Sequence, residues 1–459
     1  MKGFQLNPNT RRKWLRFRSI RRGYFSFLTL LALTGLALLG PLLVGNRALI
    51  VRHGGHWYFP VFSKALPGDT FGLGHRHETD YRILKGRLKT EAMEAGKTGK
   101  PIPGNWLLLP PIPYNGTEVC EVRAPLELRD GRYFLNGEAY AEGKAFIFGA
   151  DGRPRREWGV IDGRLHGMFA GYDEHGEITE RGRWENGRAA RYARATADGT
   201  FKAEPLPAEL AGNGGNPAAT LSCLLPCPTP PGVGGHLLGT DESGHDVLAR
   251  LFHGFRILCA ASAIYLALTC LIGVSLGCMM GYRGGWFDII CQRAIEIWSN
   301  VPHLYLIIFL TSLLIPNLLW LMLILVAFSW ITLAGYMRTA TYREKERDYV
   351  AAARLLGASE ARIIFRHILP NTLSILVTFL PFMVAAVVFQ LTALDFLGFG
   401  LPPTEPTWGE MLRQGTENFD SPWIFASVAT CLVVLLTLVT FVGEAIREAF
   451  DPKKFTTYQ

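Results

Sequence analysis

The stretch DYVAAARLLGASEARIIFRHILPN, residues 348–371, decides the fold. It predicts two short helices joined by Gly357, which stands where a helix end favours a left-handed residue. Asp348 is a suitable N-cap for the first helix and Ser359 for the second, while Pro370 ends or kinks the element before the next apolar run. A bent, basic element with a face of small residues favours a docking surface for a soluble partner. Taken alone, however, the stretch fits an ordinary loop between two membrane helices more simply.

The same stretch resembles the EAA loop of ABC importer permeases, where Glu-Ala-Ala is followed by three residues, Gly, nine residues and Ile-x-Leu-Pro. Ala351 stands in place of the family's Glu, and His367 in place of its Ile. The resemblance implies that the element docks on a partner ATPase. The residues to which it gives this coupling role are Ala351, Ala352, Ala353, Gly357, Ala358, Ser359, Leu369 and Pro370.

Composition favours a membrane protein, since 49% of the 459 residues are hydrophobic and the mean hydropathy is +0.16. Residues 25–44 form a charge-free run of 20 residues, long enough to cross the hydrocarbon core. The run is too long for a signal peptide and lacks a small-residue cleavage site, so we expect a retained first helix. We expect six transmembrane helices in an all-α polytopic protein, the other five at about 256–280, 296–315, 318–337, 371–394 and 422–443.

The distribution of Lys and Arg predicts the orientation of these helices. Residues 11–22, 338–366 and 447–454 are strongly basic, and basic loops stay on the cytoplasmic side. Both termini are therefore expected in the cytoplasm, and residues 46–250 outside the plasma (inner) membrane, in a periplasm if the cell has one.

Residues 127–203 contain turn signals at regular intervals, each a dipeptide that ends in glycine. Short aromatic and β-branched stretches lie between them, so the pattern predicts stacked β-hairpins. The segment resembles MORN-like or YwqK-like repeats, and we expect an inserted extracytoplasmic β-rich module of unknown role, or a spacer. The turns are Asp130-Gly131, Asp151-Gly152, Asp162-Gly163, His175-Gly176, Asn186-Gly187 and Asp198-Gly199.

The other residues expected outside the membrane suggest one possible disulfide and no metal site. Cys223 and Cys227, with Pro226 between them, could form a small loop disulfide outside the cell. No metal site is expected, because no second cysteine or histidine pair has ligand spacing, and a solvated loop explains the cluster of His75, His77, Glu78 and Asp80 better. The expected divisions are 1–45 (N-terminus and first helix), 46–126 (outer loop), 127–203 (β-hairpin insert), 204–235 (linker) and 236–459 (permease core).

Two further stretches resemble permeases of the dipeptide and oligopeptide importers. Residues 236–250 resemble the segment before their second helix, with Asp241 or Ser243 as the expected helix cap. Residues 394–403 resemble their re-entrant outer loop, in which Asp395, Gly398 and Gly400 are the residues of interest. Residues 11–23 and 57–60 narrow the resemblance to the C-type, YejE-like subunit of a microcin C or peptide importer. It covers about 1–60 and 236–452, with the repeat insert outside it.

Two other classes of function are disfavoured. The chain lacks the glycine-rich phosphate loop of ATPases, since Gly96-Lys97-Thr98 imitates only its end and Glu91 stands where the first glycine belongs. We therefore expect no catalysis and no cofactor here, with ATP and Mg²⁺ bound by a partner. The apolar runs hold no central ionisable residue, which disfavours an ion-coupled transporter. A structural anchor for the repeats would need one helix, not six.

The resemblance thus implies a type I ABC importer permease that moves peptides or peptide-like solutes by alternating access. It also implies four kinds of contact, with a homologous second permease, cytoplasmic ABC ATPase domains, an extracytoplasmic solute-binding protein and membrane lipid. No nucleic acid is expected as a partner, and the sequence does not identify the residues that bind the solute.

Overall fold

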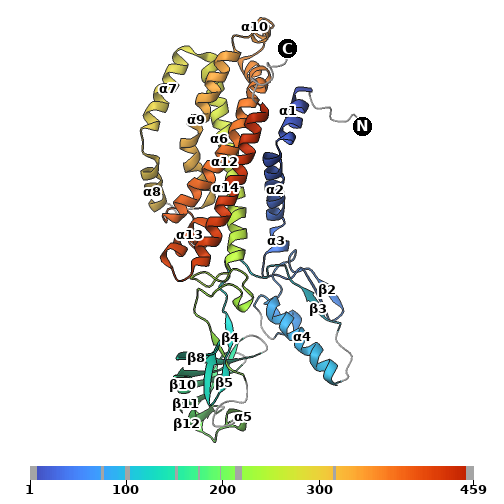
Figure 1. The fold of residues 1–459 in the computed structure, drawn as a ribbon, viewed down its shortest axis with the longest axis vertical. Helices are drawn as coiled ribbons and strands as arrows, with labels where there is room; N and C mark the ends of the chain where they lie inside the picture. Colours follow the sequence, from blue (N-terminus) through green and yellow to red (C-terminus); the bar gives the residue numbers. More distant parts are fainter. Residues whose placement is uncertain are drawn as a thin grey trace. The chain divides into compact units, whose positions relative to one another are not determined.

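A computed structural model describes residues 8–73, 77–98, 104–149, 153–173, 176–196, 198–211, 220–313 and 317–450. The chain divides into two compact units, the first made of residues 1–40 and 250–459 and the second of residues 41–249. Helices dominate the first unit and strands the second (Figure 1). Four residues singled out in the sequence lie outside the described ranges: His75, Asp151, Gly152 and His175.

The helical unit begins with the basic helix α1 and the apolar helix α2, and continues after the second unit with α6. Its elements are α1 (Pro8–Ser19), α2 (Arg21–Leu38), α6 (Val247–Arg283), α7 (Gly285–Ser299), α8 (His303–Leu313), α9 (Leu318–Glu344), α10 (Asp348–Leu355), α11 (Glu360–Arg362), the π-helical turn η4 (Ile363–Ile368), α12 (Leu369–Phe396), α13 (Trp408–Glu417) and α14 (Pro422–Phe450).

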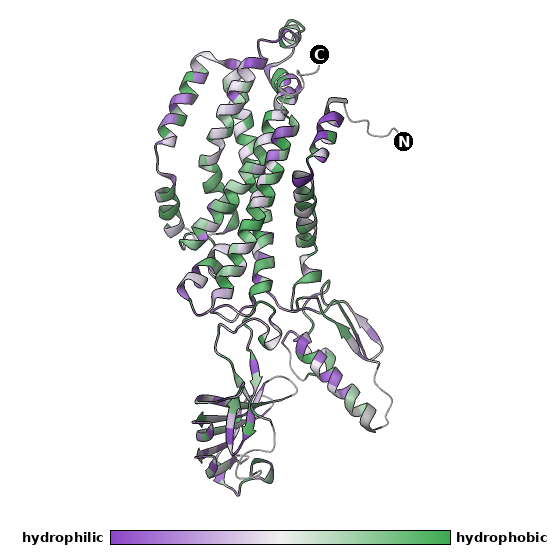
Figure 2. Ribbon diagram, in the orientation of Figure 1, coloured by the Kyte–Doolittle hydropathy of each residue, from purple (hydrophilic) through white to green (hydrophobic). Residues whose placement is uncertain are grey.

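In the described residues, four helical segments are long and apolar enough to cross a membrane: Val247–Arg283, Leu318–Glu344, Glu360–Phe396 and Pro422–Phe450. Figure 2 shows the hydrophobic colouring along these long helices. The helices α7 and α8 would add a fifth span, but they are bent by 70°. The span expected at about 296–315 is interrupted, because the chain breaks between Ser299 and His303. The count of six is not confirmed, since α2 has only 18 residues and includes Arg21 and Arg22.

Small residues allow α6 and α9 to pack closely. Gly273, Gly277 and Gly281 recur every fourth residue of α6 and lie on one helix face. A Cβ atom added at Gly277 would lie 2.4 Å from the carbonyl oxygen of Ala334 on α9, so the two backbones nearly touch. This spacing of small residues is typical of helix contacts within membranes, where close packing replaces the hydrophobic effect.

The cap of α6 differs from the expectation. Asp246, rather than Asp241 or Ser243, caps the helix, since its Oδ1 accepts a hydrogen bond from the backbone N–H of Ala249 at 2.7 Å. Asp241 instead accepts a hydrogen bond from the backbone N–H of His245 at 2.8 Å.

The second unit begins with a small sheet in the order β2-β1-β3, covered on one face by α4 (Tyr81–Thr98). Val51, Phe71, Tyr81 and Leu84 fill the core between them and are almost fully buried. The other elements here are α3 (Gly40–Leu43), β1 (Ile50–His53), β2 (His56–Tyr58), η1 (Gly68–Phe71) and β3 (Trp106–Leu108).

Residues 123–224 contain an antiparallel sheet in the order β13-β12-β11-β10-β9-β8-β14-β4, beside a three-stranded sheet β5-β6-β7. Trp158, Phe169 and Trp184 stack in the core. The strands are β4 (Arg123–Pro125), β5 (Glu127–Arg129), β6 (Arg132–Leu135), β7 (Glu138–Ala139), β8 (Glu142–Phe148), β9 (Pro154–Ile161), β10 (Arg164–Tyr172), β11 (Ile178–Glu185), β12 (Arg188–Ala195), β13 (Phe201–Ala203) and β14 (Ser222–Leu224); short helices are α5 (Ala208–Ala211) and η3 (Val233–Gly235).

Three of the predicted turns have the expected backbone conformation in the described residues. Asp130, Asp162 and Asn186 each have a positive φ, as do the glycines that follow them. The sheet also includes β4 and β14, so it extends beyond 127–203 and into the expected linker. The likeness to MORN-like repeats stays a prediction.

The expected disulfide is not formed in the structure, where Cys223 and Cys227 are both free. Cys223 lies on β14 with its side chain fully buried in the sheet core. Cys227 follows the end of that strand, and its Sγ lies 3.1 Å from where a Cβ on Gly244 would be. The Cys223 thiol therefore lies in the sheet core, and the Cys227 thiol lies beside Gly244.

Candidate functional site

The quoted stretch folds as a helical hairpin of α10 and α11, here called the α10–α11 hairpin (residues 348–362). Gly357 joins the helices with φ +74°, which confirms the predicted left-handed conformation. The backbone N–H of Gly357 donates to the carbonyl of Arg354 at 3.0 Å, and that of Ala358 to the carbonyl of Ala353 at 3.1 Å. These two bonds close the end of α10 in the manner of a Schellman motif.

One of the two expected helix caps is present. Ser359 caps α11, because its Oγ accepts a hydrogen bond from the N–H of Arg362 at 3.4 Å. Asp348 is the first residue of α10 rather than its cap, and Arg347 stands in the capping position without a side-chain hydrogen bond.

The base of the hairpin is anchored in the helical unit. The base consists of Val350 and of the turn η4 that follows the hairpin, whose Ile363, Ile364 and Ile368 are buried together with Val350 against α6 and α9. The guanidinium of Arg283, at the end of α6, pairs with Glu360 at 2.9 Å. An apolar base with a charged clamp at its edge holds the hairpin in a fixed orientation.

The tip of the hairpin is exposed. Leu355 and Leu356 are 89% and 87% exposed, although leucine is usually buried. Ala351, Ala352 and Gly357 are exposed beside them. Leu355 and Leu356 thus form a small exposed apolar patch next to a buried base.

The structure separates the predicted coupling residues into two groups. Ala353 is only 8% exposed and packs in the base, so it does not share the exposed surface on which Ala352 lies. Ala358 and Leu369 also pack against the base, while Pro370 is the second residue of α12. The sequence reasoning missed Leu355 and Leu356, which follow the buried positions Val350 and Ala353 at the end of α10.

The other predicted site is the α12–α13 loop (residues 397–407). Asp395 Oδ1 accepts a hydrogen bond from the backbone N–H of Leu401 at 2.8 Å, which folds the loop back on the end of α12. Gly398 has φ +80°. A Cβ on Gly400 would lie 1.7 Å from Asp395 Oδ1, so the loop closes only over a glycine.

The same loop is fastened to α6. Arg250 is fully buried and donates to the backbone carbonyls of Pro403 and Glu405 at 3.2 and 3.1 Å. The indole N–H of Trp408 donates to the carbonyl of Leu251 at 2.8 Å. Asp395, Gly398 and Gly400 thus build a packed structural turn. The α12–α13 loop and the α10–α11 hairpin lie at opposite ends of the helical unit (Figure 1).

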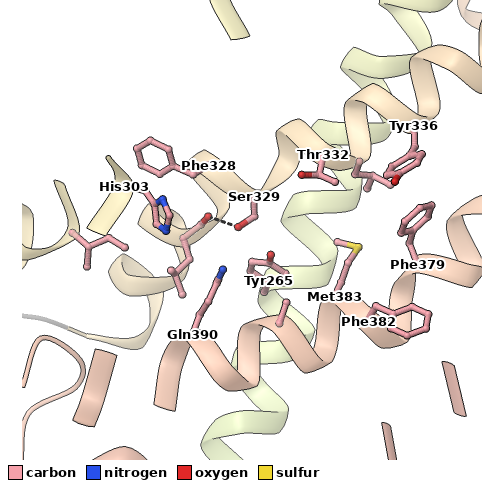
Figure 3. Close-up of a pocket in the computed structure, with 14 residues that line it drawn as sticks. Tyr265, His303, Phe328, Ser329, Thr332, Tyr336, Phe379, Phe382, Met383 and Gln390 are labelled. Atoms are coloured by element: carbon pink, nitrogen blue, oxygen red, sulfur yellow. Dashed lines mark hydrogen bonds between the residues drawn. The ribbon is translucent and has the colours of Figure 1, made fainter. Parts of the chain in front are cut away.

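A cavity of about 380 Å³ opens between α6, α8, α9 and α12. Figure 3 shows Gln390 extending toward Tyr265 and Ser329, with His303 on one side and Tyr336 and Phe379 on the other. Among the residues that the structure describes, the buried Oε1 atom of Gln390 has no hydrogen-bond partner. The 14 lining residues include hydroxyl, amide, imidazole and aromatic groups but no carboxylate, ammonium or guanidinium. Such a lining can hydrogen-bond a polar ligand without selecting its charge. The sequence did not identify these residues, because they come from four separate helices.

Comparisons with known proteins identify relatives that are membrane permeases. Residues 273–456 match the family described as binding-protein-dependent transport system inner membrane component. The chain is 32% identical to the inner membrane ABC transporter permease protein YejE of Escherichia coli, over 98% of this chain and 99% of that protein. It is 31% identical to the peptidoglycan transport system permease protein YejE of Agrobacterium fabrum, over 98% and 94%.

More distant matches cover the helical part. The oligopeptide transport system permease protein OppC of Mycobacterium tuberculosis is 33% identical over 49% of this chain and 77% of its own length. A chain of the MetNI methionine ABC transporter covers 44% of this chain at 18% identity with a TM-score of 0.37, too low to support an argument.

The two YejE proteins correct one expectation. Their similarity extends over nearly the whole chain, so the region between residues 60 and 236 does not lie outside the resemblance. The relatives carry a corresponding segment, and their printed names describe transport permeases. Because it is 31–32% identical to these proteins over nearly its full length, the chain belongs to the family of YejE-like inner-membrane permeases of ABC transporters.

Proposed function

We propose that this chain is a permease subunit that imports peptides or peptide-like solutes, and that the α10–α11 hairpin receives the motion of a partner ATPase. The exposure of Leu355 and Leu356 on an anchored base carries the proposal. A soluble ATPase could cover these two side chains, and the buried base would pass its movement to α6 and α9. The names of YejE and OppC relatives support the solute class.

The energy source and the partners are part of the same proposal. ATP and Mg²⁺ are bound by the partner ATPase domains, and this chain supplies no catalytic group. A homologous second permease faces the helical unit, and a solute-binding protein delivers the solute from outside. The cavity lined by Gln390, Tyr265 and Ser329 then lies on the solute path, where its uncharged groups can bind peptide amides whatever the side-chain charge.

The proposed topology has six spans: α2, α6, the bent pair α7–α8, α9, α12 and α14. Both termini are cytoplasmic, and residues 46–250 are periplasmic. Basic residues support this orientation, since α1 contains Arg11, Arg12, Lys13, Arg16 and Arg18, and the hairpin follows Arg343, Lys345 and Arg347. Protease cleavage of the 123–224 region from the outside of spheroplasts is expected, whereas cleavage only from the cytoplasmic side would reverse the topology.

Replacing the exposed leucines tests the docking role. The double variant Leu355→Asp, Leu356→Asp should fold normally, because neither side chain is buried, yet lose ATPase association. Loss of two apolar contacts and burial of two charges should weaken binding by more than about tenfold. The measurements are co-purification of the ATPase and solute-stimulated ATP hydrolysis in the reconstituted transporter.

Phe419 provides the matched control. It is 85% exposed in the connection between α13 and α14, at the other end of the helical unit. Phe419→Asp should leave ATPase association unchanged. Equal association in the leucine variant and in the Phe419 variant would rule out the docking role of the hairpin.

A further inference from the structure

The small sheet of the second unit has an unusual solvent-facing side, here called the Trp57 face (Ile50, Arg52, Trp57, Trp106 and Leu108). Register places these residues together, because Arg52 on β1 lies directly opposite both Trp57 on β2 and Trp106 on β3. Ile50 lies opposite Leu108 in the next row. Directly paired residues point to the same side of a sheet, so all five share one face.

The two indoles form an ordered cluster. Their ring centroids are 5.6 Å apart at an interplanar angle of 87°, and the guanidinium carbon of Arg52 lies 5.6 Å from the Trp57 ring. Trp57 and Trp106 are nevertheless 54% and 41% exposed. The opposite side of the sheet carries Val51, which is fully buried. One side of the sheet therefore packs against the core of the unit, while the side that carries the two indoles is exposed.

The chemistry of the face is apolar, aromatic and cationic, without a carboxylate among its five residues. Within the described part of the chain, Arg52 makes no ion pair, and its ring contact is with Trp57. Tryptophan and arginine together suit the headgroup layer of a bilayer, where indoles meet both apolar chains and polar carbonyls and a guanidinium meets phosphate. A protein partner would use similar residues, so position along the chain must decide between them.

The chain runs from the apolar segment directly into this sheet. Residues 25–44 are free of charge, and α3 ends at Leu43. From there the backbone is already paired: the N–H of Ile112 donates to the carbonyl of Leu43 at 3.1 Å, and the N–H of Leu49 donates to the carbonyl of Leu108 at 2.8 Å. No free linker separates the end of the apolar run from β1. In the proposed topology, in which α2 crosses the membrane, the sheet therefore lies close to the point where the chain leaves the membrane.

We infer that the Trp57 face lies in the lipid headgroup layer and binds the bilayer surface, with Arg52 at a lipid phosphate and the two indoles around it. This anchoring rests on the membrane location of the family and on the exit of the first apolar segment. It needs neither the peptide solute nor the ATPase, so its failure would leave the proposed function untouched.

The experiment uses the complete transporter, labelled with 5-fluorotryptophan and reconstituted into nanodiscs of phosphatidylcholine and phosphatidylglycerol. Trp57→Phe and Trp106→Phe assign two of the chain's fluorine resonances by their disappearance, and Trp184→Phe assigns that of a buried control in the same unit. Each resonance is measured with a headgroup-nitroxide lipid and, separately, with a water-soluble gadolinium chelate.

The inference predicts that the nitroxide lipid broadens the Trp57 and Trp106 resonances strongly while the Trp184 resonance keeps its width. Arg52→Glu should reduce the residence of the face in the headgroup layer about fivefold, and Arg52→Lys should preserve it. Broadening by the chelate alone would show a face free in water. Protection from both agents would show a face covered by protein. Either result overturns the inference.

Discussion

The α10–α11 hairpin and the α12–α13 loop lie at opposite ends of the helical unit, and the sequence drew attention to glycines in both (Figure 1). In the hairpin, Gly357 has φ +74° and no atom within 4 Å of where its Cβ would lie. At the other end, a Cβ on Gly400 would fall 1.7 Å from Asp395, and one on Gly409, at the start of α13, 2.3 Å from the carbonyl oxygen of Thr392. Gly357 is required for its left-handed backbone conformation, whereas Gly400 and Gly409 are required because a side chain would collide with neighbouring atoms.

That difference separates a contact surface from a packed joint. A turn with open space around its glycine and exposed leucines beside it is free to receive another protein. At the other end, Gly400 and Gly409 lie so close to Asp395 and Thr392 that a side chain has no room there, although Gly398 in the same loop has open space. Glycines that are equally prominent in the sequence therefore lie in different surroundings, and substitutions should distinguish the roles proposed for them.

The largest effect is expected from Gly409→Ala. The added methyl group meets the Thr392 carbonyl at 2.3 Å and the Asp395 Cβ at 2.4 Å, and neither is the end of a flexible side chain. Overpacking against a fixed backbone should lower the free energy of unfolding by about 3 kcal/mol or more. Thermal unfolding of the purified permease in detergent measures the loss.

Gly398→Ala is the matched control for that variant. Gly398 has φ +80° but open space around it, so the substitution should cost only about 1–2 kcal/mol of backbone strain. If Gly409→Ala were no less stable than Gly398→Ala, the packed description of this end would be wrong.

An intermediate effect, on coupling rather than stability, is expected at Gly357. Valine at φ +74° carries about 1–3 kcal/mol of strain, enough to reduce docking affinity about tenfold or more. Gly357→Asn should be tolerated, because asparagine adopts the left-handed conformation more readily. Solute-stimulated ATP hydrolysis in the reconstituted transporter should fall in the valine variant and persist in the asparagine variant. Normal stimulation in both would mean that the hairpin conformation does not matter for coupling.

The smallest effect is expected at the charged clamp of the hairpin. Arg283 and Glu360 are about half exposed, so their attraction is weakened by water. Removing either partner by Arg283→Ala or Glu360→Ala should change stability by less than about 1 kcal/mol. A double-mutant cycle of thermal unfolding measures the pair directly, and a coupling energy well above that limit would show that the clamp, not the apolar base, positions the hairpin.

The sequence predicted local conformation well where one residue determines it. Gly357 and the turns Asp130-Gly131, Asp162-Gly163 and Asn186-Gly187 have the expected positive φ, because few residues adopt this conformation and the backbone there has little choice. The sequence predicted poorly which side chains are exposed to solvent. Ala353 and Ala352 are identical in the motif, yet only tertiary packing turns one into the base and the other outward.

Features assembled from distant residues could not be predicted. The cavity around Gln390 draws on four helices, and the break between α7 and α8 interrupts what reads as a continuous apolar run. The free thiols of Cys223 and Cys227 follow from a strand that reaches into the expected linker. The cavity and the strand pairing depend on residues far apart in the sequence, which a local pattern does not contain. The break between α7 and α8 is local, at residues 300–302, where the proline was an available signal.

Photo-crosslinking from the tip of the hairpin tests the central claim most directly. A p-benzoylphenylalanine placed at position 356 in the reconstituted transporter should crosslink to the ATPase subunit on irradiation, since Leu356 is 87% exposed and its support is rigid. The same group at position 419 should give no such adduct. Efficient crosslinking to the ATPase from 356 alone is the predicted result. Absence of an ATPase adduct from 356 in an assembled, hydrolysing transporter would contradict the account.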